Sequence, residues 1–176
     1  FLEREARFAG QAFEAEEAVA RALAIAKGAA RPVVIADTQD NPGAGGDSDT
    51  TGLLRALVSA GASRAAMGLI VDREAARLAH EAGQGATLTL ALGGRSGIPG
   101  DRPFEAEFTV ESLSDGRFIA TGPYYGGSAL ALGPSACLSI GGVRIAVTSE
   151  KAQLADREMF RFLGIVPEEA GVLVVK

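Results

Sequence analysis

Hydrophobic and polar positions in the first half of the chain follow two periods, and each period predicts a type of element. In three segments apolar residues recur every three to four positions, as in helices with one buried face. Two short apolar runs, "RPVVIAD" and "RAAMGLIVD", favour buried parallel strands. The helical segments are 14–27, 50–61 and 72–83. This order of strand, helix, strand and helix indicates a βαβ arrangement around a parallel sheet.

Apolar and polar residues alternate over much of the second half, which is typical of antiparallel strands. Turn signals such as Asp115-Gly116 and Gly141-Gly142 separate these segments. A helix near 155–163, capped by Asp156, and a strand in "GVLVVK" are expected after them. The expected strands are "ATLTLALGG", "FEAEFTVESL", "RFIATG", "ACLSIGG" and "VRIAVTSE". The predicted fold class is mixed α/β (α+β), with a small parallel βαβ layer followed by an antiparallel meander and a C-terminal helix and strand.

The length of 176 residues is enough for one buried core and short for two domains. We interpret residues 14–176 as a single domain. Residues 1–13 open with "FLEREARF", and we interpret them as the tail of a helix or a linker from a preceding domain.

Charge and composition narrow the classes of partner. The net charge is −5 and basic residues form no long run, which argues against a nucleic-acid partner. No apolar run approaches the roughly 18 to 20 residues that would span a bilayer, so no membrane partner is expected. The single cysteine, Cys137, fits a reducing compartment, and a cytoplasmic location is expected.

The segment "DTQDNPGAGGDSDTT", residues 37–51, is the strongest candidate for chemistry, and we call it the acidic loop. It lies between a predicted parallel strand and a helix, where open α/β sheets place their ligand crevices. A phosphate would be repelled by its four carboxylates, no Walker Lys is present, and Pro42 breaks the EF-hand pattern. Asp40 and Asp49, with Asn41 between them, could ligate a hard cation, orient a water molecule or hold an amine.

A structural interpretation of the same loop stays open. Asp49 could act only as the N-cap of the following helix, while Asp40 and Asn41 make Asx-turns. One acid is enough for a cap, and the excess of acids favours a functional role.

The residue types argue against a zinc centre built by this chain alone. Catalytic zinc generally needs three protein ligands, and the sequence has one His and one Cys, far apart. No set of metal ligands is therefore predicted in this chain.

The segment "GGRSGIPGDRP", residues 93–103, is read as a flexible connection whose Arg95 and Arg102 could also bind a carboxylate or phosphate.

The segment "RPVVIADTQDNPGAGGDSDTTGLLRAL" resembles the opening motif of the C-terminal domain of the microcystinase C family, the M81 zinc metallopeptidases. The resemblance continues through "GLIVDREAARLAHEAGQGATLTLALGG", "LGPSACLSIGGVRIAVTSEKAQ" and "FRFLGIVPEEAGVLVVK", so it covers nearly the whole chain. Asp47, an additional acid in the loop, has no place in the family pattern.

The resemblance implies metal-assisted hydrolysis of linear peptides. It implies zinc bound by a separate N-terminal domain, which would be the partner of this chain, with no cofactor held by the chain alone. Catalytic or metal-supporting roles would fall to Asp40, Asn41 and Asp49. Substrate contacts would fall to Gly43, Gly45, Thr50 and Arg95.

The leading hypothesis is therefore the C-terminal domain of a zinc peptidase or amidohydrolase, inactive alone, that supplies the D-N-P-G loop of a shared cleft. One alternative is a structural or dimerisation domain without catalytic residues, and a homo-oligomer is compatible with every reading. A second alternative is a stand-alone domain that binds a small amine or cation.

Overall fold

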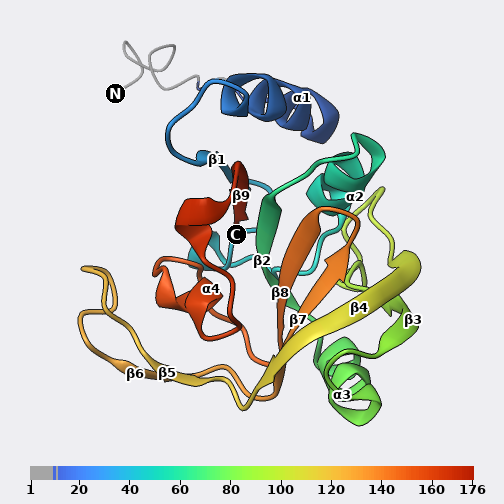
Figure 1. Ribbon diagram of the computed structural model, residues 1–176, viewed down its shortest axis with the longest axis vertical. Helices are drawn as coiled ribbons and strands as arrows, with labels where there is room; N and C mark the ends of the chain where they lie inside the picture. The colour runs from blue at the N-terminus through green and yellow to red at the C-terminus, as the bar shows by residue number, and fades with distance from the viewer. Residues whose placement is uncertain (1–9, 11) are drawn as a thin grey trace.

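The computed structural model describes residue 10 and residues 12–176. In the described part of the chain, nine strands and four α-helices form the framework drawn in Figure 1, and seven of the strands form one sheet in the order β1-β9-β2-β8-β7-β4-β3. The elements are α1 (Ala15–Ala26), β1 (Val33–Ala36), η2 (Pro42–Ala44), α2 (Gly52–Ser59), β2 (Ala65–Val71), α3 (Arg73–Ala82), β3 (Thr87–Leu92), β4 (Phe104–Ser114), β5 (Arg117–Ile119), β6 (Ala129–Ala131), β7 (Ser135–Ile140), β8 (Val143–Thr148), α4 (Glu158–Arg161), η3 (Pro167–Glu169) and β9 (Val172–Val175). The predicted mixed α/β class is confirmed.

The parallel half of the sheet contains β1, β9, β2 and β8. The expected βαβ pattern is present, but β1 and β2 are not neighbours, because β9 lies between them and pairs with both. Ala36 is in register with Val175. This register places the residues after β1 beside the residue after β9, which builds the candidate site described below.

The antiparallel half contains β8, β7, β4 and β3, as the alternating pattern predicts. Gly141 and Gly142 connect β7 to β8, and Gly141 has the positive φ of 56° that such a tight turn requires. The chain leaves this sheet after β4 to form a separate two-stranded sheet of β5 and β6. Strand β6 was not predicted, because its sequence, Ala-Leu-Ala, is entirely apolar and shows no alternation.

Two apolar clusters cover the two faces of the seven-stranded sheet. On one face, β2 and β8 side chains such as Met67 and Ile145 pack with helices α1, α2 and α3. On the other face, Leu69 and Ala146 pack with Phe160 of α4. Because β2 lies in the middle and is covered on both faces, six of its seven residues are buried.

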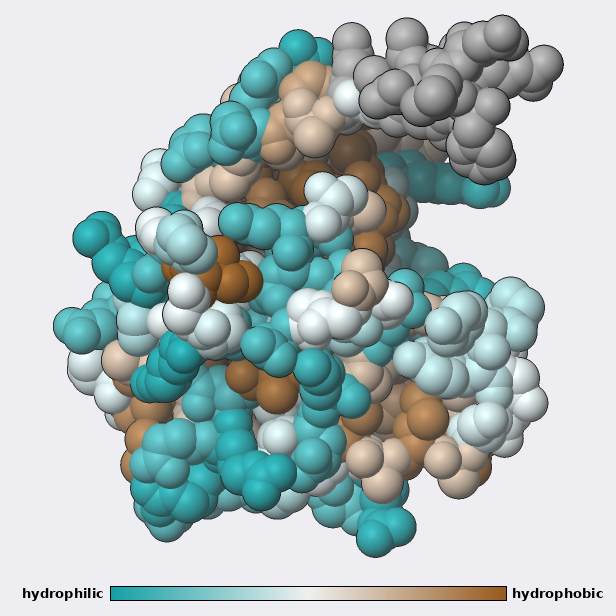
Figure 2. Space-filling view, turned by 180° about the vertical axis from the view of Figure 1, so that it is seen from behind, coloured by the Kyte–Doolittle hydropathy of each residue, from teal (hydrophilic) through white to brown (hydrophobic). Residues whose placement is uncertain are grey.

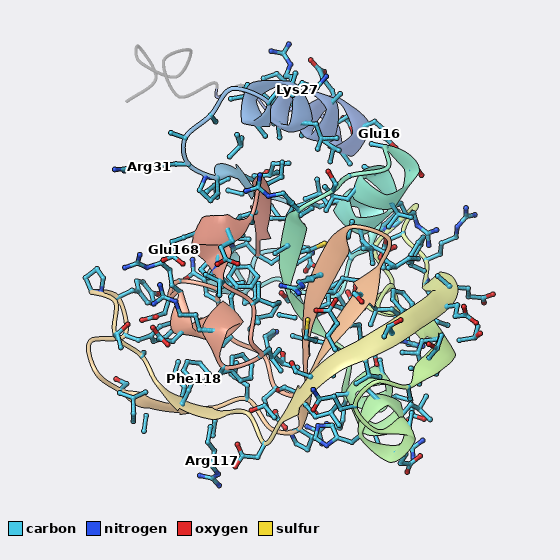
Figure 3. All side chains as sticks on the ribbon, viewed as in Figure 1. Glu16, Lys27, Arg31, Arg117, Phe118 and Glu168 are labelled. Carbon is cyan, nitrogen blue, oxygen red and sulfur yellow. The ribbon has the colours of Figure 1, made fainter. Side chains whose placement is uncertain are left out.

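The last helix is shorter than predicted, and Asp156 does not simply cap it. Helix α4 covers only Glu158–Arg161, and Asp156 accepts hydrogen bonds from the N–H groups of Glu158 at 2.9 Å and Gly122 at 2.6 Å. Asp156 therefore also ties the β5–β6 hairpin to α4. In Figure 3, Phe118 points from this hairpin toward α4, where it stacks on Phe162 with ring centroids 4.8 Å apart, while Arg117 points away.

The expected tail of a preceding helix in residues 1–13 lies mostly outside the described residues. Among the residues that are described, no helix has the length and apolar character needed to cross a bilayer.

We predict that Leu57→Ala lowers the free energy of unfolding by about 2 to 5 kcal/mol, because the Leu57 side chain of α2 is completely buried against the sheet and its removal leaves a cavity. Ile25→Ala, on the exposed side of α1, is the matched control and is expected to cost less than about 0.5 kcal/mol. Urea denaturation of both variants measures the difference. Equal losses in the two variants would contradict this assignment of the core.

Candidate functional site

A buried lysine organises the acidic loop. Lys176 follows β9 and is 1% exposed. Its Nζ lies 2.8 Å from Asp37 Oδ2 and 2.9 Å from Asp40 Oδ2, and it donates a 2.6 Å hydrogen bond to Thr50 Oγ1. The lysine therefore joins the start of the loop, its middle and the approach to α2.

Asp40 accepts hydrogen bonds on both carboxylate oxygens and is completely buried. Oδ1 accepts from the N–H of Ser48 at 2.8 Å, and Oδ2 accepts from the N–H of Thr50 at 2.8 Å as well as from Lys176. Burial alone would raise the pKa of this carboxyl, but the hydrogen bonds from Thr50, Lys176 and Ser48 together outweigh burial and lower the pKa from 3.8 to about 2. Asp40 is therefore a firmly ionised carboxylate that holds the loop in shape.

The glycine-rich turn folds closely over Asp40. Asn41 Oδ1 accepts a 2.8 Å hydrogen bond from the N–H of Gly43, which confirms the Asx-turn reading for this residue. Gly45 has a φ of 94°, and a Cβ on Gly46 would lie 2.7 Å from Asn41 N and from Asp40 Oδ1. The turn thus needs glycine at both positions, one for its backbone conformation and one for space.

The Asx-turn expected of Asp40 is made by Asp37 instead. Asp37 Oδ1 accepts from the N–H of Gln39 at 2.9 Å and from the N–H of Asp40 at 3.1 Å. The unplaced acid Asp47 forms an exposed ion pair with Lys151, 3.1 Å between Nζ and Oδ1. Each of these acids therefore has a defined structural partner.

Asp49 joins the acidic loop to residues 93–103, which we call the second loop. Its Oδ2 accepts hydrogen bonds from the N–H groups of Arg95 at 2.7 Å and Ser96 at 2.9 Å. The N-cap of α2 is Thr51, which makes no side-chain capping bond. The reading of Asp49 as a simple helix cap is therefore wrong.

The Arg95 side chain points to α3 rather than to Asp49. Its guanidinium Nη1 lies 2.6 Å from Asp72 Oδ2, and Asp72 also caps α3 by accepting from the N–H of Ala75 at 3.0 Å. The predicted N-cap role of Asp72 is thus confirmed. The second loop, read from sequence as flexible, is bound on one side to Asp49 and on the other to Asp72.

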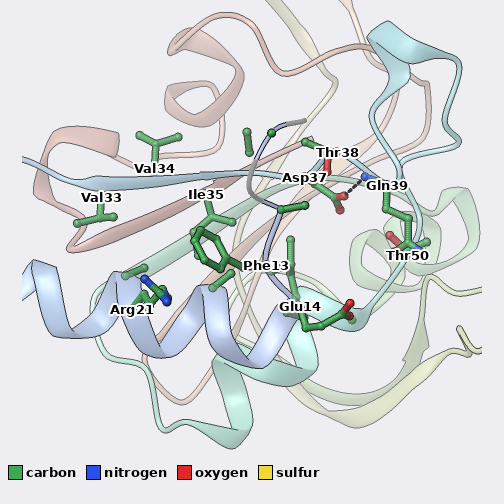
Figure 4. A pocket seen from close by; sticks show the side chains of 18 of the residues that line it. Phe13, Glu14, Arg21, Val33, Val34, Ile35, Asp37, Thr38, Gln39 and Thr50 are labelled. Atoms are coloured by element: carbon green, nitrogen blue, oxygen red, sulfur yellow. Dashed lines mark hydrogen bonds between the residues drawn. The ribbon is translucent and has the colours of Figure 1, made fainter. Parts of the chain in front are cut away.

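A cleft of about 880 Å³ lies between α1 and β1 and reaches the start of the acidic loop. Asp37, Gln39 and Thr50 line its polar end, as the close-up in Figure 4 shows. Phe13 lies along its apolar part, with the guanidinium of Arg21 4.4 Å from the ring centroid. In Figure 2, apolar side chains gather in a hollow at the α1 end of the molecule.

The residues that commonly bind zinc are dispersed in the described part of the chain. There, no group of three or more His, Cys, Asp or Glu side chains is arranged to hold a metal ion. The imidazole Nε2 of His80 lies 3.0 Å from the carbonyl oxygen of Ser135, and burial raises the pKa of the Cys137 thiol to about 12. A zinc ion therefore does not fit the residues that the structure describes.

Comparison with known proteins identifies the family. The family described as MlrC C-terminus matches residues 35–176, which is most of the chain and includes both loops. The chain belongs to this family.

Two relatives support the membership in the MlrC C-terminus family. Microcystinase C from Sphingomonas sp is 32% identical over 162 residues, which are 92% of this chain and 31% of the relative. A solved structure of a candidate metallopeptidase from Mesorhizobium sp. BNC1 superposes with a TM-score of 0.84 at 25% identity, over 98% of this chain and 34% of that protein. The chain thus spans about a third of the length of these two relatives.

Sequence reasoning found the acidic loop but missed Lys176, its main electrostatic partner. The register of β1 and β9 reveals this partnership. Ala36 and Val175 are the last paired residues of the two strands, and Asp37 follows the first while Lys176 follows the second. Local sequence could not show this pairing, because it depends on β9 lying beside β1.

We predict that acid destabilises the protein partly through Asp40. Because the pKa of Asp40 is lower in the folded state, its contribution is complete above about pH 4 and is lost as the pH falls toward 2. The loss should amount to about 2 kcal/mol and should be absent in Asp40→Asn. Urea denaturation at pH 6, 4 and 2.5 measures it, with exposed Asp47→Asn as control. The same pH slope in wild type and Asp40→Asn would contradict the prediction.

Proposed function

We propose that this chain is the C-terminal part of a zinc-dependent peptidase or amidohydrolase related to microcystinase C. In this proposal a preceding domain holds the zinc ion, and the acidic loop forms one wall of the cleft between the two domains. The substrate is a linear peptide.

The observation that carries the proposal is the fixed position of the acidic loop beside the cleft. Lys176, Asp37 and Asp40 hold the loop by buried charges, while Gln39 and Thr50 reach the cleft. A site that orients a substrate needs groups whose positions are set before the substrate arrives. The acidic loop meets this requirement.

The geometry divides the roles among the residues expected to be catalytic. A general base works best with a pKa near the operating pH, and the pKa of Asp40 is lowered to about 2. Asp40 therefore positions the acidic loop, and Asp49 positions the second loop through its bonds to the N–H groups of Arg95 and Ser96. Asn41 has its side-chain oxygen bound to Gly43, and its amide nitrogen can donate to a peptide carbonyl.

The apolar part of the cleft fits a contact with the preceding domain. Phe13, Ile25 and Val34 are 42%, 60% and 58% exposed and all line the cleft. Apolar surface gathered in one place usually marks a site of association. In the proposal, this surface is covered in the two-domain enzyme.

The alternative of a purely structural domain is favoured by a different observation. Every hydrogen bond found for Asp40 serves to hold the chain together, and Asp49 binds backbone N–H groups of the second loop. If the acidic loop has only this role, its surface residues can be changed without effect on turnover.

Asn41→Asp separates these two functions, because the aspartate keeps the oxygen that binds Gly43 and replaces only the amide nitrogen. In the zinc-loaded full-length enzyme, we expect at least a tenfold loss in kcat/KM for linear peptides and a melting temperature within about 2 °C of wild type.

Asp47→Asn lies in the same loop and serves as the matched control, with unchanged kcat/KM. Unchanged turnover in both variants would refute the catalytic proposal and support the structural alternative.

A further inference from the structure

Three buried polar atoms where the two loops meet have no hydrogen-bond partner within the described part of the chain. They are Asp49 Oδ1, Ser96 Oγ and Asp101 Oδ2. Two are carboxylate oxygens and one is a hydroxyl. Buried polar atoms are nearly always paired, so three unpaired atoms in two adjoining loops point to a missing ligand.

Hydrogen bonds of the other atoms attach Ser96 and Asp101 to the short segment 49–51, which contains Asp49. Asp49 Oδ2 accepts from the N–H of Ser96 at 2.9 Å, so Asp49 and Ser96 adjoin. Asp101 Oδ1 accepts from both the N–H and the hydroxyl of Thr51, each at 3.1 Å, and Thr51 is two residues from Asp49. The second loop thus begins and ends on the same short segment before α2.

Two cationic side chains of these segments, Arg95 and Arg55, are bound to other groups. The guanidinium of Arg95 binds Asp72 and the carbonyl of Ala91. Arg55 donates to the carbonyl oxygens of Arg102 at 2.8 Å and Pro103 at 2.6 Å. A buried carboxylate oxygen without a partner is costly, and a cation close to Asp49 Oδ1 and Asp101 Oδ2 would remove that cost.

We propose that Asp49, Ser96 and Asp101 form part of a binding site for one hard divalent cation of the calcium type. The available atoms are all oxygens, which suit calcium better than zinc, and calcium tolerates irregular sites completed by carbonyl oxygens and water. Because the three atoms are buried, a single ion fits better than the amine of a peptide. The site does not depend on the proposed peptidase function, and it differs from the expectation that this chain holds no metal.

The direct test is calcium binding to the chain after treatment with a chelator. Isothermal titration with CaCl₂ should show one ion per chain. The melting temperature should rise by about 5 °C when calcium exceeds its dissociation constant a hundredfold. No binding heat and no shift in melting temperature would overturn the proposal.

Asp49→Asn and Asp101→Asn localise the site, because Asn keeps one acceptor oxygen for the existing hydrogen bonds and replaces the unpaired oxygen with an amide. Each variant should bind calcium at least tenfold more weakly. The melting temperature of each variant without calcium is the reference against which its calcium-induced shift is measured.

Two further variants keep the test decisive. Asp47→Asn, an exposed acid of the same loop, should bind calcium as wild type does. Ser96→Ala removes only a hydroxyl and should weaken binding severalfold, which tests the site even if an Asn variant does not fold. Wild-type affinity in Ser96→Ala and in the folded Asn variants would place the calcium elsewhere and overturn the proposal.

Discussion

The buried ammonium group of Lys176 is the interaction on which the arrangement of the acidic loop depends. A lysine with a fully buried side chain must be compensated, and Asp37 and Asp40 supply two carboxylates within 3 Å of its Nζ. Because Lys176 follows β9 and Asp37 follows β1, the pairing of these two strands decides where the charges meet. The sheet order therefore sets the shape of the acidic loop, although Asp40 in that loop is more than a hundred residues from Lys176 in sequence.

From this centre, hydrogen bonds extend through both loops to α3. Asp40 binds the backbone before α2, Asp49 binds the second loop, and Arg95 of that loop binds Asp72 at the start of α3. Most of these contacts join charged groups to backbone N–H groups, which are among the stronger hydrogen bonds in proteins. The result is a polar edge held by hydrogen bonds beside an apolar cleft, and the proposed function rests on this arrangement.

Local patterns predicted most helices and strands, because the period of apolar residues depends only on neighbours along the chain. They also located the acidic loop and the N-cap role of Asp72. They failed where the partner is distant in sequence: the cap role considered as an alternative for Asp49 is wrong, because Asp49 binds Arg95 and Ser96. Lys176 was missed because its role appears only when β9 is placed between β1 and β2.

Lys176 and Asp40 stabilise the fold as a buried pair, and a double-mutant cycle measures the coupling between them. Urea denaturation would compare wild type, Lys176→Met, Asp40→Asn and the double variant. We expect Lys176→Met alone to cost about 3 to 5 kcal/mol, because it leaves two buried carboxylates without their cation. The double variant should lose at least about 1 kcal/mol less than the sum of the single losses. Additive losses would show that the two residues act independently and would contradict the account.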